Sequence, residues 1–385
     1  MTSRIHPSVA GLPEQPTSPR HPAIPRATTA EEARRDAAWD ALVEGVADGD
    51  LVQTTSWASI RQRLGTPVCH LRVHTRDGTL LGGCLMQHRR VLPGIRIGAV
   101  SRGPLLFAHH PGAAEQVVRE MIATARHLGI QLLVVQPPEG DAGLLGALER
   151  AGFRPGGPQI APTATIRIDL RPTEEELLGR LEQKRRHRIR HGLRDGLRTE
   201  ESDDVEAFHR LHVETATRQS FQPLGLDYLK AQWEVLAPLG MCRIAITSQA
   251  GVPLAAEWLT SFAGKRTCRL TGAVPAAPVP GARNASSALI WAVIQQARRD
   301  GEQMLDFGGF DRAAAEEIVA GRPPPPSFID SPSQFKKSFG GQVALLPGPH
   351  FILPDRIARA ALTGAAQRLM LHPALQRFAQ RMRSG

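Results

Sequence analysis

The sequence predicts a mixed α/β protein made of two halves with the same plan. Two segments repeat one order of turn, strand, strand, helix, glycine and strand, and they do so at nearly the same spacing. The chain of 385 residues is long enough for two ordinary domains. Its hydrophobic content of 42% is normal for a globular protein. The sequence thus describes two similar globular units in tandem.

The first copy begins at a hairpin turn, Arg76-Asp77-Gly78, which leads into the extended stretch TLLGGCLMQHRR. The stretch RIGAVSRGPLL follows, and then EQVVREMIATARHLG, whose pattern is helical. Gly129 ends this helix, and the buried strand IQLLVVQ comes next, which is the usual punctuation between a helix and a strand. This order predicts a strand meander that feeds a helix and one more strand.

The second copy has the same parts in the same order. Its turn contains Gly251 within SQAGVPLAAEWLTSF, KRTCRLTGAV supplies the next strand, and SSALIWAVIQQARRDG is the helix. Gly301 ends that helix before the strand EQMLDFG. The spacing also repeats, since Gly78 and Gly129 are 51 positions apart and Gly251 and Gly301 are 50 apart. Internal duplication explains the match, and chance similarity between two α/β segments is the alternative. The plan of each half resembles an acyl-CoA N-acyltransferase (GNAT) domain, so we expect two tandem GNAT-like domains.

The chain divides into four segments. Residues 1–28 are expected to be a disordered tail, because prolines interrupt them throughout. Residues 29–160 form the first domain and residues 161–342 the second, which opens with the alternating strand TATIRIDL. Residues 343–385 are expected to be a basic helical segment that packs on the first domain. Because this segment carries six arginines, contact with an anionic membrane is the other option.

The composition limits the cellular compartment and the classes of binding partner that we expect. No apolar run approaches the ~18 residues of a transmembrane helix, and the N-terminus has no apolar stretch typical of a signal peptide. The four cysteines show neither metal-ligand nor CxxC spacing, which favours reduced thiols and no metal site. We therefore expect a cytoplasmic protein, free or peripheral at the inner membrane face. The net charge of +10 indicates a polyanionic partner or a general arginine bias.

A strongly basic stretch runs from Arg180 to Arg198. It holds eight Lys or Arg residues against two acids, and Leu177, Leu181 and Ile189 suggest a helix with one buried edge. This density of positive charge suits contact with a phosphate backbone, and a solvated helix face is the alternative. The candidate phosphate contacts are Lys184, Arg186 and Arg190.

The strand after Gly301 ends in Asp306-Phe307-Gly308-Gly309. Carboxyl ends of strands in open α/β sheets face the ligand crevice, and glycines there let the backbone approach a ligand closely. Asp306 is therefore a candidate catalytic group, and Gly308 and Gly309 are candidate substrate contacts. A tight turn capped by Asp306 is the alternative.

The stretch FKKSFGG places Lys336 and Lys337 between two phenylalanines, Phe335 and Phe339. Because the phenylalanines are four apart, they predict the buried stripe of a short helix, which the glycine pair ends. A cation on such a rigid base can be aimed at a phosphate or at a developing oxyanion. An amphipathic surface helix is the alternative.

Several familiar motifs are absent. The chain has no Walker loop, no HExxH, no GxSxG and no Rossmann glycine pattern. A CoA-dependent GNAT domain carries a glycine-rich loop whose amides hold the pyrophosphate at a helix N-terminus. The second half has Gly281-Ala282-Arg283-Asn284 at that place, and the first half offers no better match around residues 109–114. This argues against CoA.

Together these features resemble the FemABX family, the aminoacyl-tRNA-dependent transferases that build peptidoglycan cross-bridges. The resemblance covers roughly residues 51–353. Its most specific parts are LDFGG from Leu305 and FKxxFGG from Phe335; weaker parts are QxxxWxxxR from Gln53 to Arg61, RGPLL, and the basic helix. The resemblance implies twin GNAT-like domains, a charged tRNA as donor in place of CoA, and no bound cofactor.

The resemblance also implies a role for each candidate residue. Lys336, on the helix that Phe335 anchors, faces the tRNA acceptor end and the reacting ester. Asp306 is a candidate general base. Arg61 faces the diphosphate of the acceptor, and Arg218 is a second acceptor-side arginine. The implied tRNA contacts are Lys184, Arg186, Arg190 and Lys337.

We therefore expect an aminoacyltransferase that moves an amino acid from aminoacyl-tRNA to an amine and forms an amide. The acceptor is a peptidoglycan precursor, lipid-linked or nucleotide-linked, or a small natural-product amine, and DNA is not an expected partner. The single tyrosine, Tyr228, departs from the family's acceptor site. Two alternatives are an N-acyltransferase that uses acyl-CoA or an acyl-carrier protein, and a non-catalytic module that binds RNA or membrane.

Overall fold

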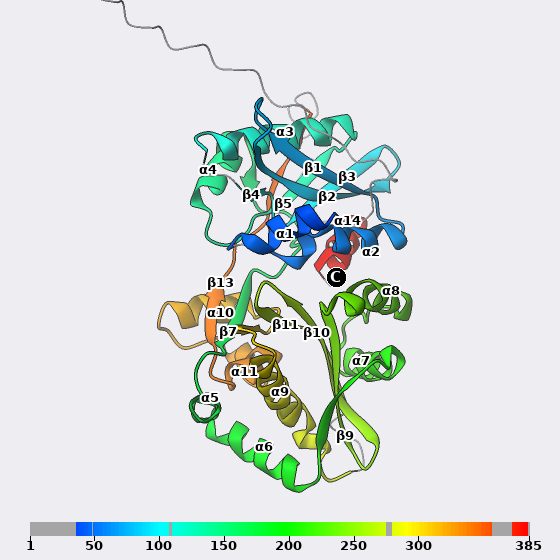
Figure 1. Cartoon of the computed structure of the whole chain (residues 1–385), viewed down its shortest axis with the longest axis vertical. Coiled ribbons are helices and arrows are strands. Elements are labelled where there is room, and N and C mark those ends of the chain that lie inside the picture. Colours follow the sequence, from blue (N-terminus) through cyan, green and yellow to red (C-terminus); the bar gives the residue numbers. More distant parts are fainter. Residues whose placement is uncertain (1–35, 48, 108–109, 275–278, 356–371, 384–385) are drawn as a thin grey trace, which may run out of the picture.

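The structure, a computed structural model, describes residues 36–47, 49–107, 110–274, 279–355 and 372–383. These residues form two α/β domains that lie one above the other in Figure 1, each built on a seven-stranded sheet. The expected N-terminal tail, residues 1–28, lies outside the described residues.

The first domain contains the first sheet and the helices that surround it. Its strands are β1 (Val68–His74), β2 (Leu80–Leu92), β3 (Ile95–Ser101), β4 (Leu105–Leu106), β5 (Leu132–Gln136), β6 (Arg154–Pro155) and β14 (His350–Ile352). Its helices are α1 (Ala37–Gly45), the short η2 (Leu51–Gln53), α2 (Thr55–Arg63), α3 (Ala113–His127) and α4 (Ala142–Arg150). The strand order is β1-β2-β3-β5-β14-β6, with β4 beside β2, and α3 and α4 pack their apolar faces on this sheet.

The second domain has the same layout with more helices. Its strands are β7 (Ala164–Asp169), β8 (Arg198–Ser202), β9 (Cys242–Gln249), β10 (Val252–Phe262), β11 (Lys265–Ala273), β12 (Met304–Asp306) and β13 (Gln342–Leu345), in the order β13-β7-β12-β11-β10-β9-β8. Its helices are α5 (Glu174–Arg180), α6 (Gln183–Arg194), α7 (Val205–Gln219), α8 (Leu226–Leu236), η3 (Ala237–Leu239), α9 (Ala282–Arg299), α10 (Arg312–Val319), η4 (Pro326–Phe328) and α11 (Pro332–Lys337). Residues of α6 and α9 share one apolar core with the sheet, and residues of α7 and α8 share another.

The predicted internal repeat is confirmed. β1, β2, β3, α3 and β5 follow one another as β9, β10, β11, α9 and β12 do, with an antiparallel meander and then a parallel pair in each domain. The four punctuating glycines all have positive φ, at 91° and 65° for Gly78 and Gly129 and at 79° and 80° for Gly251 and Gly301. Glycine adopts this conformation without the strain that a Cβ adds. The expected fold class therefore holds.

The structure corrects two expected boundaries. The second domain does not end at residue 342, because β13 continues the second sheet to Leu345 and β14 then returns the chain to the first sheet. The basic stretch is not one helix, because it breaks after Arg180 into α5 and α6. Leu177, Leu181 and Ile189 are buried as the sequence predicts.

The last described helix is α14 (Pro373–Arg383), where Leu375 and Ala379 pack in the core of the first domain. The preceding residues of the basic C-terminal segment, 356–371, lie outside the described residues. Within the described ranges, no helix combines the length and the apolar character that crossing a membrane requires.

Two side chains hold the two connections between the domains. Gln136, at the end of β5, is fully buried; its amide accepts from the backbone N–H of Ala161 at 2.9 Å and donates to the carbonyl of Pro347 at 2.9 Å. Arg312 of the second domain donates to the carbonyl of Leu346 at 3.0 Å and to that of Thr163 at 2.7 Å. Each of these side chains binds both connections, so together they tie the two connections to each other.

One irregularity in the second sheet brings a side chain against the first domain. The register between β10 and β11 shifts at Arg269, which is the extra residue of a β-bulge. β11 pairs with β12 only over Lys265–Thr267, and beyond these residues the two strands are no longer paired. Bulges re-aim side chains and end regular pairing. Here the Arg269 guanidinium lies over Trp57 of the first domain, 5.4 Å from its ring centroid.

Candidate functional site

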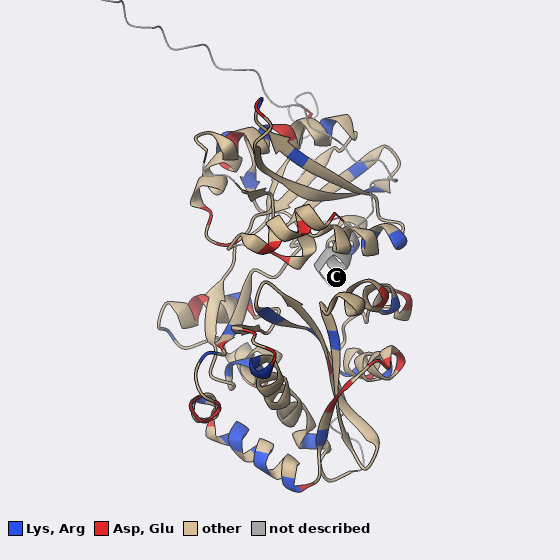
Figure 2. Ribbon diagram, in the orientation of Figure 1, with Lys and Arg blue, Asp and Glu red and all other residues tan. Residues whose placement is uncertain are grey.

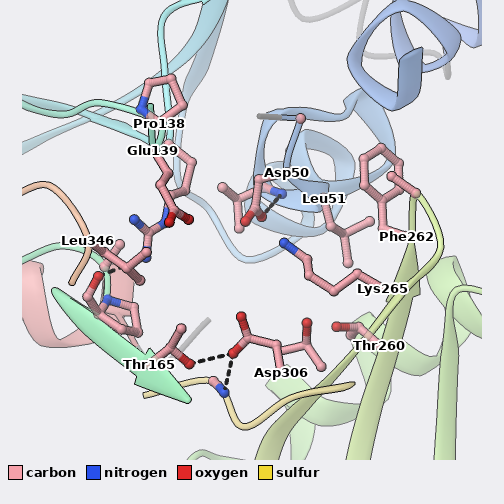
Figure 3. A pocket seen from close by; sticks show the side chains of 18 of the residues that line it. Asp50, Leu51, Pro138, Glu139, Thr165, Thr260, Phe262, Lys265, Asp306 and Leu346 are labelled. Carbon is pink, nitrogen blue, oxygen red and sulfur yellow. Dashed lines mark hydrogen bonds between the residues drawn. The ribbon is translucent and has the colours of Figure 1, made fainter. Parts of the chain in front are cut away.

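A pocket of about 530 Å³ opens between the two domains, and Figure 3 shows charged side chains from both domains at its walls. The first domain contributes the carboxylates of Asp50 and Glu139 and the guanidinium of Arg102. The second domain contributes Arg167, Lys265, Arg269 and Asp306 with the hydroxyls of Thr165, Thr260 and Thr267. A cavity of this size with convergent polar groups is a good candidate for a ligand site.

Asp306 stands at the floor of this pocket, at the end of β12. Its carboxylate accepts from the Thr165 hydroxyl at 2.5 Å, from Nε of Arg167 at 3.0 Å and from the backbone N–H of Gly308 at 2.7 Å. Burial alone would raise the pKa of Asp306, but the Thr165 hydroxyl and the charge of Arg167 hold that pKa below its usual range. The geometry therefore favours an ionised carboxylate that anchors the turn over the expected proton acceptor.

The turn after Asp306 needs its first glycine. Gly308 has a φ of 70°, and a Cβ at this position would lie 2.3 Å from the carbonyl oxygen of Cys268 on β11. Any other residue would combine backbone strain with a clash against the main chain. Gly308, a candidate substrate contact, lines the pocket.

Lys336 reaches the same turn from helix α11. Its half-buried side chain turns inward, and the ammonium donates to the carbonyls of Phe307 at 2.9 Å and Gly309 at 2.7 Å. Burial lowers the pKa of Lys336, while the acidic groups of Glu257, Cys268 and Asp306 oppose this shift. Asp306 and Gly308 line the pocket and Lys336 does not. The turn therefore stands between the pocket and Lys336.

The phenylalanines of the FKxxFGG stretch hold helix α11 in the core. Phe339 is 1% exposed and stacks edge-on with the half-buried Phe335 at 5.3 Å between ring centroids. Phe339 also lies 5.8 Å from the ring of Phe307, in the turn that Lys336 binds. The structure thus brings together Phe335, Lys336, Asp306, Gly308 and Gly309, from two motifs distant in the sequence.

Sequence reasoning missed one buried acid beside this cluster. Glu257 on β10 is 1% exposed and accepts a hydrogen bond from the Thr271 hydroxyl at 2.7 Å. Burial raises the pKa of Glu257 to about 8, against the opposing effects of the Thr271 bond and the Lys336 charge. A single glutamate in an apolar strand resembles an outward-facing residue, and only its place in VPLAAEWLTSF hinted at burial.

A second group of cations lies beside the pocket. Arg61 of α2 is 6% exposed, and its guanidinium carbon lies 5.3 Å from the ring centroids of both Trp57 and Tyr228. The Trp57 ring also contacts the guanidinium of Arg269, a pocket residue that no sequence pattern singled out. Since Tyr228 belongs to α8, the cluster joins the two domains next to the pocket.

Arg218 does not join this pocket. Its guanidinium is on the exposed end of α7 and donates to the carbonyl of Ala273 at 2.8 Å. Ala273 is the last residue of β11, whereas the pocket contains Lys265, the first residue of the same strand. The expected acceptor-side role of Arg218 therefore finds no support in this arrangement.

The basic residues expected to bind tRNA lie on the outside of the second domain. Figure 2 shows lysines and arginines along α6. Lys184 and Arg190 are exposed there, and Lys337 is half-buried at the end of α11. Part of the Arg186 guanidinium is used within the chain, because its NH1 donates to the carbonyls of Gly179 and Leu181.

Comparisons with known proteins agree with this architecture. A family model described as an acetyltransferase (GNAT) domain matches residues 182–317. A lipid II:glycine glycyltransferase of Staphylococcus haemolyticus is 26% identical over 211 residues, which cover 51% of this chain and 50% of that protein. The chain thus matches about half the length of these curated relatives.

Two solved structures resemble the fold. The crystal structure of FemX aligns with a TM-score of 0.68 at 16% identity and covers 88% of this chain and 99% of its own. The C-terminal domain of a putative lysylphosphatidylglycerol synthetase from Agrobacterium fabrum aligns with a TM-score of 0.52 at 15% identity and covers 88% and 96%. The chain therefore has a FemABX-like fold of two tandem GNAT-like domains and is a distant homologue of the lipid II:glycine glycyltransferases.

Proposed function

We propose that the protein is an aminoacyltransferase that moves an amino acid from aminoacyl-tRNA to an amine acceptor and forms an amide. The observation that carries the proposal is the junction of Lys336 with the turn at Gly308, at the floor of the pocket between the domains. Gly308 in the turn lines the pocket, and the carbonyls on either side of it accept hydrogen bonds from Lys336 of α11. A donor ester and an acceptor amine can therefore approach one point from two sides.

The basic face of α6 favours a nucleic-acid donor. Lys184 and Arg190 are exposed on the domain that carries Lys336, and cations spaced along a helix suit the phosphates of an RNA strand. Lys337 and the free part of Arg186 would add contacts nearer to α11. No bound cofactor is needed, because the aminoacyl ester is already activated.

The start of α9 argues against CoA in the second domain. A GNAT pyrophosphate site requires open backbone N–H groups at the N-terminus of this helix. Here the N–H of Gly281 donates to the side chain of Gln249 at 3.0 Å, and the N–H of Ala282 donates to the carbonyl of Val279 at 3.2 Å. The chain itself thus occupies two of the donors that a pyrophosphate would use.

The pocket supports an acceptor that carries negative charge near its amine. Lys265 and Arg269 line it from the second domain, and Arg102 lines it from the first. Arg269 would contact a phosphate or diphosphate of the acceptor, and the buried Arg61, on the same Trp57 ring, would add positive charge beside it. The name of the curated relatives favours a lipid-linked peptidoglycan precursor, reached at the inner membrane face. A small natural-product amine is the other acceptor class.

The reaction needs positioning more than acid–base catalysis. The acceptor nitrogen attacks the ester carbonyl, a C–N bond forms, the C–O bond to the tRNA breaks, and the 3′-terminal hydroxyl takes the proton lost by the amine. Lys336 commits two of its three N–H groups to the turn, so the third can face the developing oxyanion. Asp306 would act by holding that turn, since its own oxygens are engaged.

Binding at two salt concentrations tests the donor. We expect charged tRNA to bind with an affinity that falls as salt rises, and acetyl-CoA to leave the melting temperature unchanged. Transfer of label from a charged tRNA mixture to a lipid-linked peptidoglycan precursor or a diamine then tests the reaction. Stabilisation by acetyl-CoA with no response to tRNA would overturn the proposal in favour of a CoA-dependent N-acyltransferase, which the GNAT family match favours as the second candidate.

A further inference from the structure

The basic helix α6 contains one arginine that cannot contact a ligand on its surface. Arg185 is 7% exposed, although its neighbour Lys184 and the later Arg190 are exposed. A buried guanidinium is costly unless the structure provides partners for it. Arg185 is therefore placed for something other than binding nucleic acid.

The partners of Arg185 come mainly from the FKxxFGG motif. Its Nε donates to the Ser338 hydroxyl at 2.8 Å, and its guanidinium carbon lies 4.3 Å from the ring centroid of Phe335 and 5.1 Å from that of Phe339. Its NH1 donates to the Ser287 hydroxyl of α9 at 2.7 Å. Burial lowers the pKa of Arg185 to about 10, so it remains a cation at neutral pH.

The main chain makes the same connection. The backbone N–H of Glu182, at the start of α6, donates to the carbonyl of Ser338 at 3.0 Å. Gly340 has a φ of 80°, and a Cβ there would lie 2.5 Å from the carbonyl of Arg180. The beginning of α6 and the end of α11 are thus in direct contact through backbone and side chains.

We propose that Arg185 is a positioning residue for Lys336, which fixes α11 against the basic helix. The contacts form one path: Arg185 holds Phe335 and Ser338, and Lys336 beside them holds the carbonyls of Phe307 and Gly309. An RNA backbone bound on the outer face of α6 then brings its ester to Lys336 in a single geometry. This inference rests on the proposed function, because it assigns the outer face of α6 to the donor.

Two serines provide a matched pair of variants. Ser338 and Ser287 each give one hydroxyl to the same guanidinium, but only Ser338 belongs to the FKxxFGG motif. In single-turnover transfer at saturating charged tRNA, we expect S338A to lower the rate about tenfold and S287A to leave it within about twofold, because misplacement near the reacting atoms is expensive. Tighter evidence comes from R185M, expected to lower the rate about 100-fold, with R185K between R185M and the wild type.

The same variants should change the transfer rate but not the affinity for charged tRNA. We expect R185M and S338A to bind charged tRNA with unchanged Kd and unchanged salt slope, since the exposed cations remain. The Ser338 hydroxyl also donates to the Phe335 carbonyl, so S338A removes more than the bond to Arg185. If Ser338 acts through Arg185, the double variant R185M/S338A should transfer no more slowly than R185M alone. The exposed R322M is the control for loss of an arginine.

The outcomes separate this inference from the proposed function. If S338A and S287A have equal effects, or if the loss in R185M lies entirely in Kd, Arg185 is not a positioning residue. Hydrogen exchange needs no substrate: α11 amides should exchange faster in S338A than in S287A, and equal exchange would also overturn the inference. Failure of the wild type to use any aminoacyl-tRNA would instead sink the proposed function. Should R185M fail to fold, the serine pair decides.

Discussion

The ammonium of Lys336 donates to the carbonyl of Gly309 at 2.7 Å and, through a second bond at 2.9 Å, to that of Phe307. These two carbonyls flank Gly308, so one lysine holds both sides of the turn at the pocket floor. The two most specific motifs of the sequence, FKxxFGG and DFGG, therefore form one structural unit. A change in either motif should disturb the other.

Removal of the Lys336 ammonium should affect both activity and stability. In K336M the two carbonyls lose a buried donor, and we expect a loss of about 1–3 kcal/mol in the free energy of unfolding. Transfer should fall at least about 100-fold, because a preorganised cation near the ester is lost. Urea unfolding and single-turnover transfer measure the two effects.

The neighbouring lysine provides the stability control for this variant. Lys337 is half-buried on the same turn of α11, and K337M should unfold at nearly the wild-type urea concentration. Wild-type transfer by K336M would remove Lys336 from the reaction, whatever the change in stability.

Gly308 should tolerate no side chain. In G308A the new Cβ would meet the Cys268 carbonyl at 2.3 Å in addition to the strain of a φ of 70°. Gly321 is the matched control, since its φ is 71° and nothing lies within 4 Å of its Cβ position. We expect G321A to cost about 1 kcal/mol and G308A about 1–3 kcal/mol more, with transfer lost only in G308A. Equal costs would mean that the turn yields easily.

The sequence predicted the repeat well because its signals are local. Gly129 and Gly301 each end a helix through their own backbone preference, and the strands around them follow from short apolar runs. The path of residues 343–352 was missed for the opposite reason. β13 and β14 pair with β7 and β5, which lie far away in the chain, and no local pattern says which sheet a short strand joins.

The site was predicted in its motifs and missed in its partners. FKxxFGG and DFGG were identifiable, but the inward turn of Lys336 depends on carbonyl positions that only the folded backbone defines. Glu257 and Arg269 became notable through burial and a β-bulge, which are properties of strand register. Three donors converge on Asp306 in three dimensions, which favours an anchor of the turn over the candidate base.

Glu257 should make the stability of the protein depend on pH. Burial raises its pKa from 4.5 to about 8, so the folded state holds a proton that the unfolded state releases between these values. Stability from this group is therefore complete below about pH 4.5 and is lost as pH rises to about 8. In E257Q, unfolding measured from about pH 5 to 8 should lose this downward slope. E175Q, at an exposed position on α5, is the control, and a wild-type slope in E257Q would refute the assignment.

Gln136 should matter for the union of the two domains. In Q136L the carbonyl of Pro347 loses a donor and the N–H of Ala161 loses an acceptor, both through a fully buried side chain. We expect a loss of about 2–4 kcal/mol in the free energy of unfolding, measured by urea. Q219L, at an exposed position on α7, should change stability little. A cost in Q136L no larger than in Q219L would show that other contacts hold the connections.

The outer face of α6 should set the salt dependence of tRNA binding. Each lost phosphate contact lowers the slope of log K against log salt by about 0.7–0.9. We therefore expect K184A/R190A to lower the slope by about 1.5 in filter-binding measurements over a range of salt concentrations, with stability unchanged because both side chains are exposed. Arg171 and Arg322 are also exposed but form local ion pairs, so R171A/R322A removes the same charge as a control. Equal slopes in the two double variants would mean that tRNA responds to the net charge alone, and the donor would then have to bind on another face.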